Sequence, residues 1–171
     1  EGGFYINPNL IVTNNGTVTV NYQLLGGNAS STWVNASGAT LNVEDNLLVG
    51  AGGGTLVASA TGNTINYNGA AETVKQPVNT EYFNLILSGS GSKTLQSDII
   101  VKNDLTITSS LTSSDFDIDI KGDLNNSNVF NEGLGEVTFS GSSDQSISNP
   151  VGETFHDLRL NKPGGKLNLD D

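Results

Sequence analysis

The chain contains an internal repeat, and this repeat limits the folds that it can adopt. A segment that begins at Ile65 matches one that begins at Val137. The shift in numbering between them is constant up to Gly69 and Gly141, and it is one residue longer for all the later pairs. The matched pairs are Ile65 and Val137, Tyr67 and Phe139, Gly69 and Gly141, Val74 and Ile147, Pro77 and Pro150, Tyr82 and Phe155, Leu85 and Leu158, Leu87 and Leu160, and Lys93 and Lys166. Self-similarity at a fixed period is typical of solenoids and other repeat architectures.

A second overlap extends the repeat towards the N-terminus. At a shorter shift the matched pairs are Val43 and Val101, Leu47 and Leu105, and Val49 and Ile107. The difference between the two shifts predicts an insertion in one copy, near residues 108–121. We therefore interpret residues 1–171 as one continuous β-repeat segment. It has a degenerate copy at 1–61, a full copy with the inserted strand at 62–134 and a truncated copy at 135–171.

Short runs of alternating apolar and polar residues predict the secondary structure. They occur at residues 17–22, 64–67, 115–120 and 136–139, and Gly, Asn and Ser bound them. A period of two over four to six residues, ended by turn-forming residues, is typical of half-buried strands. No stretch repeats its apolar residues with the helical period over three turns. We therefore expect an all-β fold.

Two all-β architectures fit short strands that follow one another without linkers. The favoured one is a right-handed parallel β-solenoid (β-helix) built from imperfect repeats of about 58–73 residues. The alternative is a tandem array of immunoglobulin-like β-sandwiches, which also have short strands and frequent turns. The solenoid predicts a common interior that contains Val43, Leu47, Val57, Ile65, Tyr67, Val101, Leu105, Val129, Val137, Phe139 and Leu169.

Charge and composition exclude several functions. Eighteen acidic against seven basic residues leave a formal net charge of −11, which repels phosphate backbones, so we expect no nucleic acid as a partner. The absence of cysteine excludes thiolate metal sites, disulfides and cysteine nucleophiles. No apolar run approaches the ~20 residues that cross a bilayer, so we expect no direct membrane insertion.

Two groups of residues are candidate ligand sites. Asp115, Asp117 and Asp119 alternate along one predicted strand, so their carboxylates would share a face and could bind calcium, which prefers oxygen ligands. The competing interpretation is a solvated acidic face with the intervening apolar residues inward. Trp33, the one tryptophan, could stack on a sugar ring if it is exposed, or else fill the end of the degenerate first copy.

Three segments resemble a known class of repeats. Residues 81–95 (EYFNLILSGSGSKTL), 99–107 (IIVKNDLTI) and 135–147 (GEVTFSGSSDQSI) are similar to repeat segments of very large cell-surface proteins of Bacteroidetes bacteria. The resemblance covers about residues 41–171, and the start of the chain more weakly. It implies an exported, extracellular or cell-surface protein, commonly a substrate of type 9 secretion, with a role in adhesion, gliding motility or surface filaments.

The resemblance and the residues together predict a function that involves no catalysis. We expect a non-catalytic structural and display segment of a surface adhesin or filament-like protein, and the alternative is a carbohydrate-binding module. The expected partners are other repeats of the same chain, neighbouring surface proteins or a surface glycan. The chain begins at Glu1 without a methionine, so we expect a piece of a longer protein, whose region after about Val151 is covered by another segment.

Overall fold

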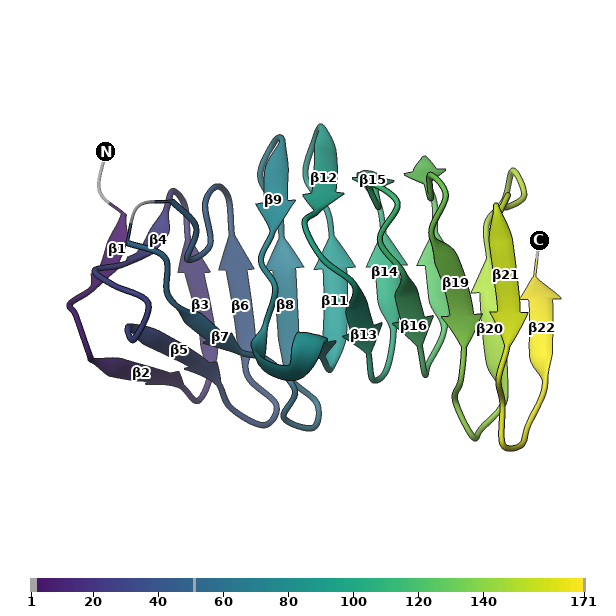
Figure 1. The fold of residues 1–171 in the computed structure, drawn as a ribbon, viewed down its shortest axis with the longest axis horizontal. Coiled ribbons are helices and arrows are strands. Elements are labelled where there is room, and N and C mark those ends of the chain that lie inside the picture. The colour runs from purple at the N-terminus through teal and green to yellow at the C-terminus, as the bar shows by residue number, and fades with distance from the viewer. Residues whose placement is uncertain (1–2, 51, 171) are drawn as a thin grey trace.

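The computed structural model describes residues 3–50 and 52–170 and is a parallel β-solenoid of about eight turns (Figure 1). The strand pairings are parallel throughout. The described residues contain no α-helix and only one 3-10 turn, Val78–Thr80. The favoured prediction is therefore confirmed. Immunoglobulin-like sandwiches are excluded because their sheets are antiparallel.

Each coil runs through three faces in a constant order, and two of the faces have a break. The first face consists of β1 (Phe4–Ile6) and β4 (Leu24–Gly26) and, further along the axis, β9 (Glu72–Val74), β12 (Ser92–Leu95), β15 (Ser110–Thr112) and β18 (Phe130–Asn131). The second begins with β2 (Ile11–Asn14), β5 (Thr32–Asn35) and β7 (Thr55–Val57). An Ala58–Tyr82 bridge joins it to β10 (Glu81–Tyr82), β13 (Ile99–Val101), β16 (Ile118–Ile120), β19 (Glu136–Phe139) and β21 (Asp157–Leu160).

The third face is one sheet of eight strands that runs the length of the solenoid (Figure 1). Its strands are β3 (Thr17–Val20), β6 (Thr40–Val43), β8 (Thr64–Tyr67), β11 (Asn84–Leu87), β14 (Leu105–Ile107), β17 (Leu124–Asn126), β20 (Gln145–Ser148) and β22 (Leu167–Asp170). In successive coils Leu85 pairs with Leu105, Leu105 with Leu124, and Leu124 with Ile147. One coil is therefore far shorter than one copy of the sequence repeat.

The sequence repeat and the coil are out of phase. Strand β8 matches β19 in sequence, but β8 lies on the third face and β19 on the second; likewise β11 on the third face matches β21 on the second. The shift between matching copies therefore covers three coils and two further faces. Each face makes the same demand, alternation followed by a tight turn, so one strand-and-turn sequence can serve on any of them. The segment 108–121 likewise forms β15, a turn and β16, which are two faces of an ordinary coil rather than one additional strand.

Inward-facing residues stack in columns along the axis and form a single core. Leu41, Ile65, Leu85, Leu105 and Leu124 occupy one such column and are fully buried. The predicted interior is confirmed at Val43, Leu47, Ile65, Tyr67, Val101, Leu105, Val137 and Phe139. At about 25 cal/mol per Å² of buried apolar surface, such columns are the main source of stability in a chain with little other apolar content.

Three predicted interior residues lie elsewhere. Val57 is half-buried, because Leu56 is the inward residue of β7, and a shift of one position moves a side chain to the other face. Val129 is 60% exposed and precedes the inward-facing Phe130. Leu169 continues the leucine column after Ile147 but is 75% exposed, because β22 is the last described strand of its sheet.

The described residues also include no helix with the length and apolarity required to cross a membrane.

Candidate functional site

Trp33 lies in the core and not on the surface. Its side chain is 1% exposed, and its ring meets that of Phe4 edge to face, with centroids 5.7 Å apart. The structure therefore corrects the prediction that Trp33 offers a platform for a sugar ring. The competing interpretation, that the indole fills the interior of the N-terminal coils, agrees with this burial.

The three alternating aspartates do not form a cluster. Asp115 lies in a turn with φ of 68°, Asp117 precedes β16, and only Asp119 belongs to that strand. The described residues contain no group of three or more acidic, histidine or cysteine side chains that could hold a metal ion. The structure thus corrects the prediction of a calcium site at these carboxylates. Positive φ at Asp115 breaks the alternation that the sequence pattern implied.

These aspartates instead connect one coil to the next. Oδ1 of Asp115 accepts a hydrogen bond from the backbone N–H of Leu134, and Oδ1 of Asp117 accepts one from Glu136, both at 2.8 Å. Oδ1 of Asp119 accepts from the hydroxyl of Ser140 at 2.5 Å. Each carboxylate therefore links its own coil to the following one.

The same link recurs at other turns, and we call it an aspartate staple: a carboxylate oxygen that accepts a backbone N–H from the next coil. Asp104 accepts from Asp123 N at 2.9 Å, Asp123 from Ser146 N at 2.7 Å and Asp144 from Lys166 N at 2.9 Å. Asp98 accepts from Asp117 N at 3.0 Å. Hydrogen bonds to a charged acceptor contribute more than neutral ones, so much of the acidic composition stabilises coil stacking.

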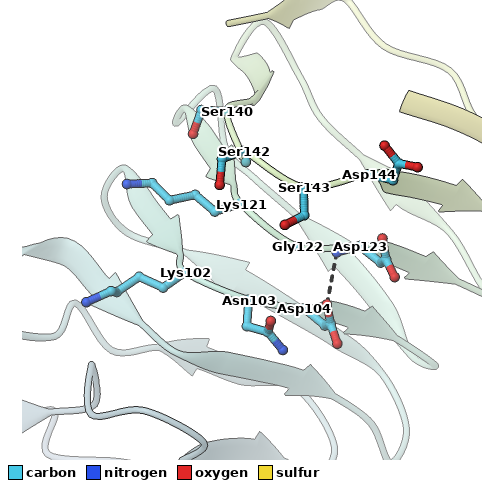
Figure 2. Close-up of a pocket in the computed structure, with 11 residues that line it drawn as sticks. Lys102, Asn103, Asp104, Lys121, Gly122, Asp123, Ser140, Ser142, Ser143 and Asp144 are labelled. Carbon is cyan, nitrogen blue, oxygen red and sulfur yellow. Dashed lines mark hydrogen bonds between the residues drawn. The ribbon is translucent and has the colours of Figure 1, made fainter. Parts of the chain in front are cut away.

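Three of the staples border a polar hollow of about 630 Å³ (Figure 2). It lies over the turns that lead from the second face to the third in three successive coils, at residues 102–104, 121–123 and 140–144. Figure 2 shows Lys102 and Lys121 extending towards one side, with Asp104, Asp123 and Asp144 on the other. The full lining is Lys102, Asn103, Asp104, Lys121, Gly122, Asp123, Ser140, Gly141, Ser142, Ser143 and Asp144.

The longest of these turns, 140–144, forms one wall of the hollow, and a buried glutamine holds it. Gln145 is 1% exposed; its Oε1 accepts the N–H of Gly141 at 2.9 Å and its Nε2 donates to the carbonyl of Ile120 at 3.1 Å. The ammonium of Lys162 donates to the carbonyls of Gly141 and Ser143, each at 2.9 Å, and to Gln145 Oε1 at 2.5 Å. The wall is therefore fixed by hydrogen bonds from both sides.

A related cage occurs around Lys93, at the turns that lead from the third face to the first. Its ammonium donates to the carbonyls of Gly69, Ala70 and Ser90 at 2.9, 2.5 and 3.0 Å and pairs with Glu72. Burial raises the pKa of Glu72, while the ammonium of Lys93 and the N–H of Gly69 oppose this shift.

The partner of Lys93 in the sequence repeat does not fill the equivalent cage. Lys166 is exposed, and Lys162, four positions earlier, places its ammonium on the turn that begins at Gly141, the match of Gly69. The cage therefore recurs with a lysine from a different position. Sequence matching located the turn, but it could not show which side chain reaches the carbonyls.

The hollow was not predicted from the sequence, although one signal for it exists. The segments Lys102-Asn103-Asp104 and Lys121-Gly122-Asp123 each place a lysine two positions before an aspartate, and they are separated by the length of one coil. Only knowledge of the coil length would have shown that these residues are neighbours. Chemically, the hollow can exchange hydrogen bonds with a polar ligand, and its lining has no apolar side chain.

A comparison of this chain with protein-family models, with curated proteins and with solved structures finds no match in any of the three.

Proposed function

We propose that this chain is a non-catalytic structural and display segment of an exported cell-surface protein of the adhesin or filament-like class. The resemblance of residues 81–95, 99–107 and 135–147 to surface-protein repeats supports the extracellular setting. Its partners are further repeats of the same chain or neighbouring surface proteins. Its function is to act as an extended spacer and to display the parts of the protein attached to it.

The observation that carries this proposal is the unbroken column of inward residues on the third face. From Leu41 to Leu124 each coil contributes one fully buried residue, and the sheet continues without a gap through eight strands. Each coil advances the solenoid by one strand spacing, about 4.8 Å, so length follows coil number. An architecture in which each coil contacts only its neighbours suits an extended, stiff spacer.

Polar side chains also hold successive coils together. Aspartates at the turns hold the next coil through backbone N–H groups, as Asp104, Asp117 and Asp123 do. Arg159, the one arginine, lies 3.5 Å from Glu136, which belongs to the preceding coil. Groups that could otherwise take part in acid–base chemistry are thus engaged in stacking, and this supports a role without catalysis.

The removal of one whole coil tests the structural role. Deletion of residues 105–123 joins Asp104 to Leu124, so that the column passes from Leu85 to Leu124 and Asp104 takes the place of Asp123. We expect a folded protein that is shorter by about 4.8 Å in small-angle X-ray scattering. As the matched control, deletion of residues 105–113 removes β14 and β15 only, breaks the order of the faces and should unfold the chain. Equal tolerance of both deletions would contradict the proposal.

Catalysis and location are tested separately. Incubation of the purified chain with neutral and acidic polysaccharides should release no reducing ends and no unsaturated products. In the native host, an antibody against the exposed second-face residues should label intact cells. Product release would overturn the non-catalytic assignment, and labelling only after lysis would overturn the surface location.

A further inference from the structure

The polar hollow over residues 102–104, 121–123 and 140–144 has the properties of a binding site for a hydroxyl-rich ligand. Its volume of about 630 Å³ lies within the ~300–1,000 Å³ that small-molecule sites occupy. Its lining consists of lysine, asparagine, aspartate, serine and glycine alone. A ligand gains little there by burying apolar surface, so it must replace the hydrogen bonds of water with its own.

The carboxylates of the hollow are oriented before any ligand arrives. One oxygen each of Asp104, Asp123 and Asp144 accepts a backbone N–H of the next coil at 2.9, 2.7 and 2.9 Å. The staple fixes the rotamer, and the second oxygen remains available as a strong acceptor for a hydroxyl group. Because the side chains are already ordered, binding requires little further loss of rotamer entropy.

The backbone of the hollow is held in place by hydrogen bonds and by close packing of its coils. Gln145 and Lys162 hold the 140–144 wall through the bonds described above. At Gly122 a Cβ atom would lie 2.4 Å from Asp104 Oδ1 and 2.4 Å from the backbone carbonyl carbon of Asn103, so the close approach of these two coils requires glycine there.

The charges of the hollow disfavour an anionic ligand. Two lysines and three carboxylates line the hollow, with the lysines extending away from the aspartates; Lys102 also pairs with Glu81 at 3.5 Å, and the net charge of the chain is −11. A polyanion is repelled by this surplus, and the described residues provide no group that could hold a metal ion. We propose that the hollow binds a neutral saccharide, with its hydroxyls donating to Asp104, Asp123 and Asp144 and an oxygen accepting from Lys121.

The periodicity of the lining favours a saccharide chain over a single sugar. Lysine and aspartate recur at equivalent positions of neighbouring coils, for example Lys102 with Lys121 and Asp104 with Asp123, one strand spacing of about 4.8 Å apart. This step is comparable with the length of one sugar unit. An oligosaccharide that lies along the solenoid axis therefore meets the same groups at two successive units, and Ser140 takes the place of the lysine in the third coil.

Amide-resolved NMR titration of the whole chain tests the proposal. The probes are short neutral oligosaccharides (gluco-, xylo- and manno-oligomers) and an oligogalacturonate as the acidic probe. We expect one neutral class to bind with millimolar or tighter affinity and to shift the amides of Gly122, Gly141 and Ser143. Binding of the acidic probe alone, with strong salt dependence, would overturn the neutral assignment, and the absence of binding by every probe would overturn the site.

Two variants and a control locate the binding. The side chains of Lys121 and Ser142 are exposed and make no hydrogen bond or ion pair with the residues that the structure describes, so neither Lys121→Ala nor Ser142→Trp should alter the fold. Lys121→Ala should weaken binding roughly tenfold, because it removes a charged donor, and Ser142→Trp should block the hollow. Thr13→Trp, on the exposed side of β2, should bind as the unaltered chain does. Equal affinity in all three variants would place the saccharide elsewhere and overturn the proposal, while leaving the structural role intact.

Discussion

Lys93 and Glu72 form an ion pair inside the solenoid, with Nζ and Oε2 3.2 Å apart and both side chains fully buried. Glu72 comes from β9 and Lys93 from β12, the next strand of the first face, and the two residues are partners in the parallel register. The ammonium reaches three backbone carbonyls as well. The pair therefore joins two coils, and the ammonium also bonds to the turns that precede β9 and β12.

Loss of one member of this pair should be costly, because the other would remain buried and uncompensated. We expect Lys93→Met to lower the free energy of unfolding by about 3–5 kcal/mol, measured by denaturant titration with circular dichroism. The matched control is Lys102→Met, because the Lys102–Glu81 pair at 3.5 Å has side chains 36% and 26% exposed and should be worth ~0–1 kcal/mol. Combining Lys93→Met with Glu72→Gln should recover part of the loss, and a double variant less stable than the single one would contradict this account.

Two buried tyrosines should make stability fall at alkaline pH. The hydroxyls of Tyr67 and Tyr82 lie 3.1 Å apart, and both also bond to the backbone of Lys75. Burial raises the pKa of both phenols well above the ordinary value of about 10. Above pH ~10 the unfolded chain releases protons that the folded chain keeps, so folding stability should decline there and not below.

The slope of this decline can be measured. Two phenols should contribute up to about 2.7 kcal/mol per pH unit, followed by denaturant titrations between pH 9 and 12. Tyr82→Phe should be less stable at neutral pH, because a hydrogen bond to Lys75 is lost, and should show a shallower alkaline slope. A slope unchanged by this substitution would mean that the tyrosines ionise within the fold.

An aspartate staple should stabilise the fold through its acceptor oxygen and not through its charge alone. Asp123→Ala removes the acceptor of Ser146 N, which lies at 2.7 Å, and should lower the free energy of unfolding by about 1–3 kcal/mol. Asp123→Asn keeps an oxygen in that position and should cost less than half as much. Thermal and denaturant unfolding of the two variants measure the difference, and equal losses would assign the effect to charge.

The facing of the core residues can be tested at one leucine and one valine. Leu105 is fully buried and Val129 is 60% exposed. Leu105→Asp places an unpaired carboxylate in the core and should unfold the chain, whereas Val129→Asp should change the melting temperature little. A folded Leu105→Asp protein would show that the third-face column is wrongly assigned.

The last described strands should exchange their amide protons faster than the central strands of the second and third faces. Leu158, Leu160 and Leu169 are 45%, 58% and 75% exposed, although each continues an inward column. Strands β21 and β22 also pair on one side only. We expect hydrogen exchange there to be much faster than in β14 and β17. Uniformly slow exchange in a strictly monomeric sample would contradict this.

Local sequence patterns were sufficient to predict the class of fold. Alternation at residues 64–67 and 136–139, and the turns after them, predict half-buried strands whatever their neighbours are, and eight of the proposed interior residues are buried. The exceptions show the limit of the pattern. At Asp115 positive φ interrupts the alternation, and at Val57 the inward position moves by one residue to Leu56.

Side-chain alternation and turn chemistry act over short stretches of chain, so the amino-acid pattern predicts stacked, alternating strands without knowledge of the fold. The folded structure sets which residues become neighbours, because partners lie a whole coil apart in the sequence and depend on how each coil closes. It placed the matching strands β8 and β19 on different faces, and it directed the aspartates to backbone N–H groups of the next coil. It also gave the second cage to Lys162 in place of Lys166. Each of these contacts is made across coils, where no local pattern reaches.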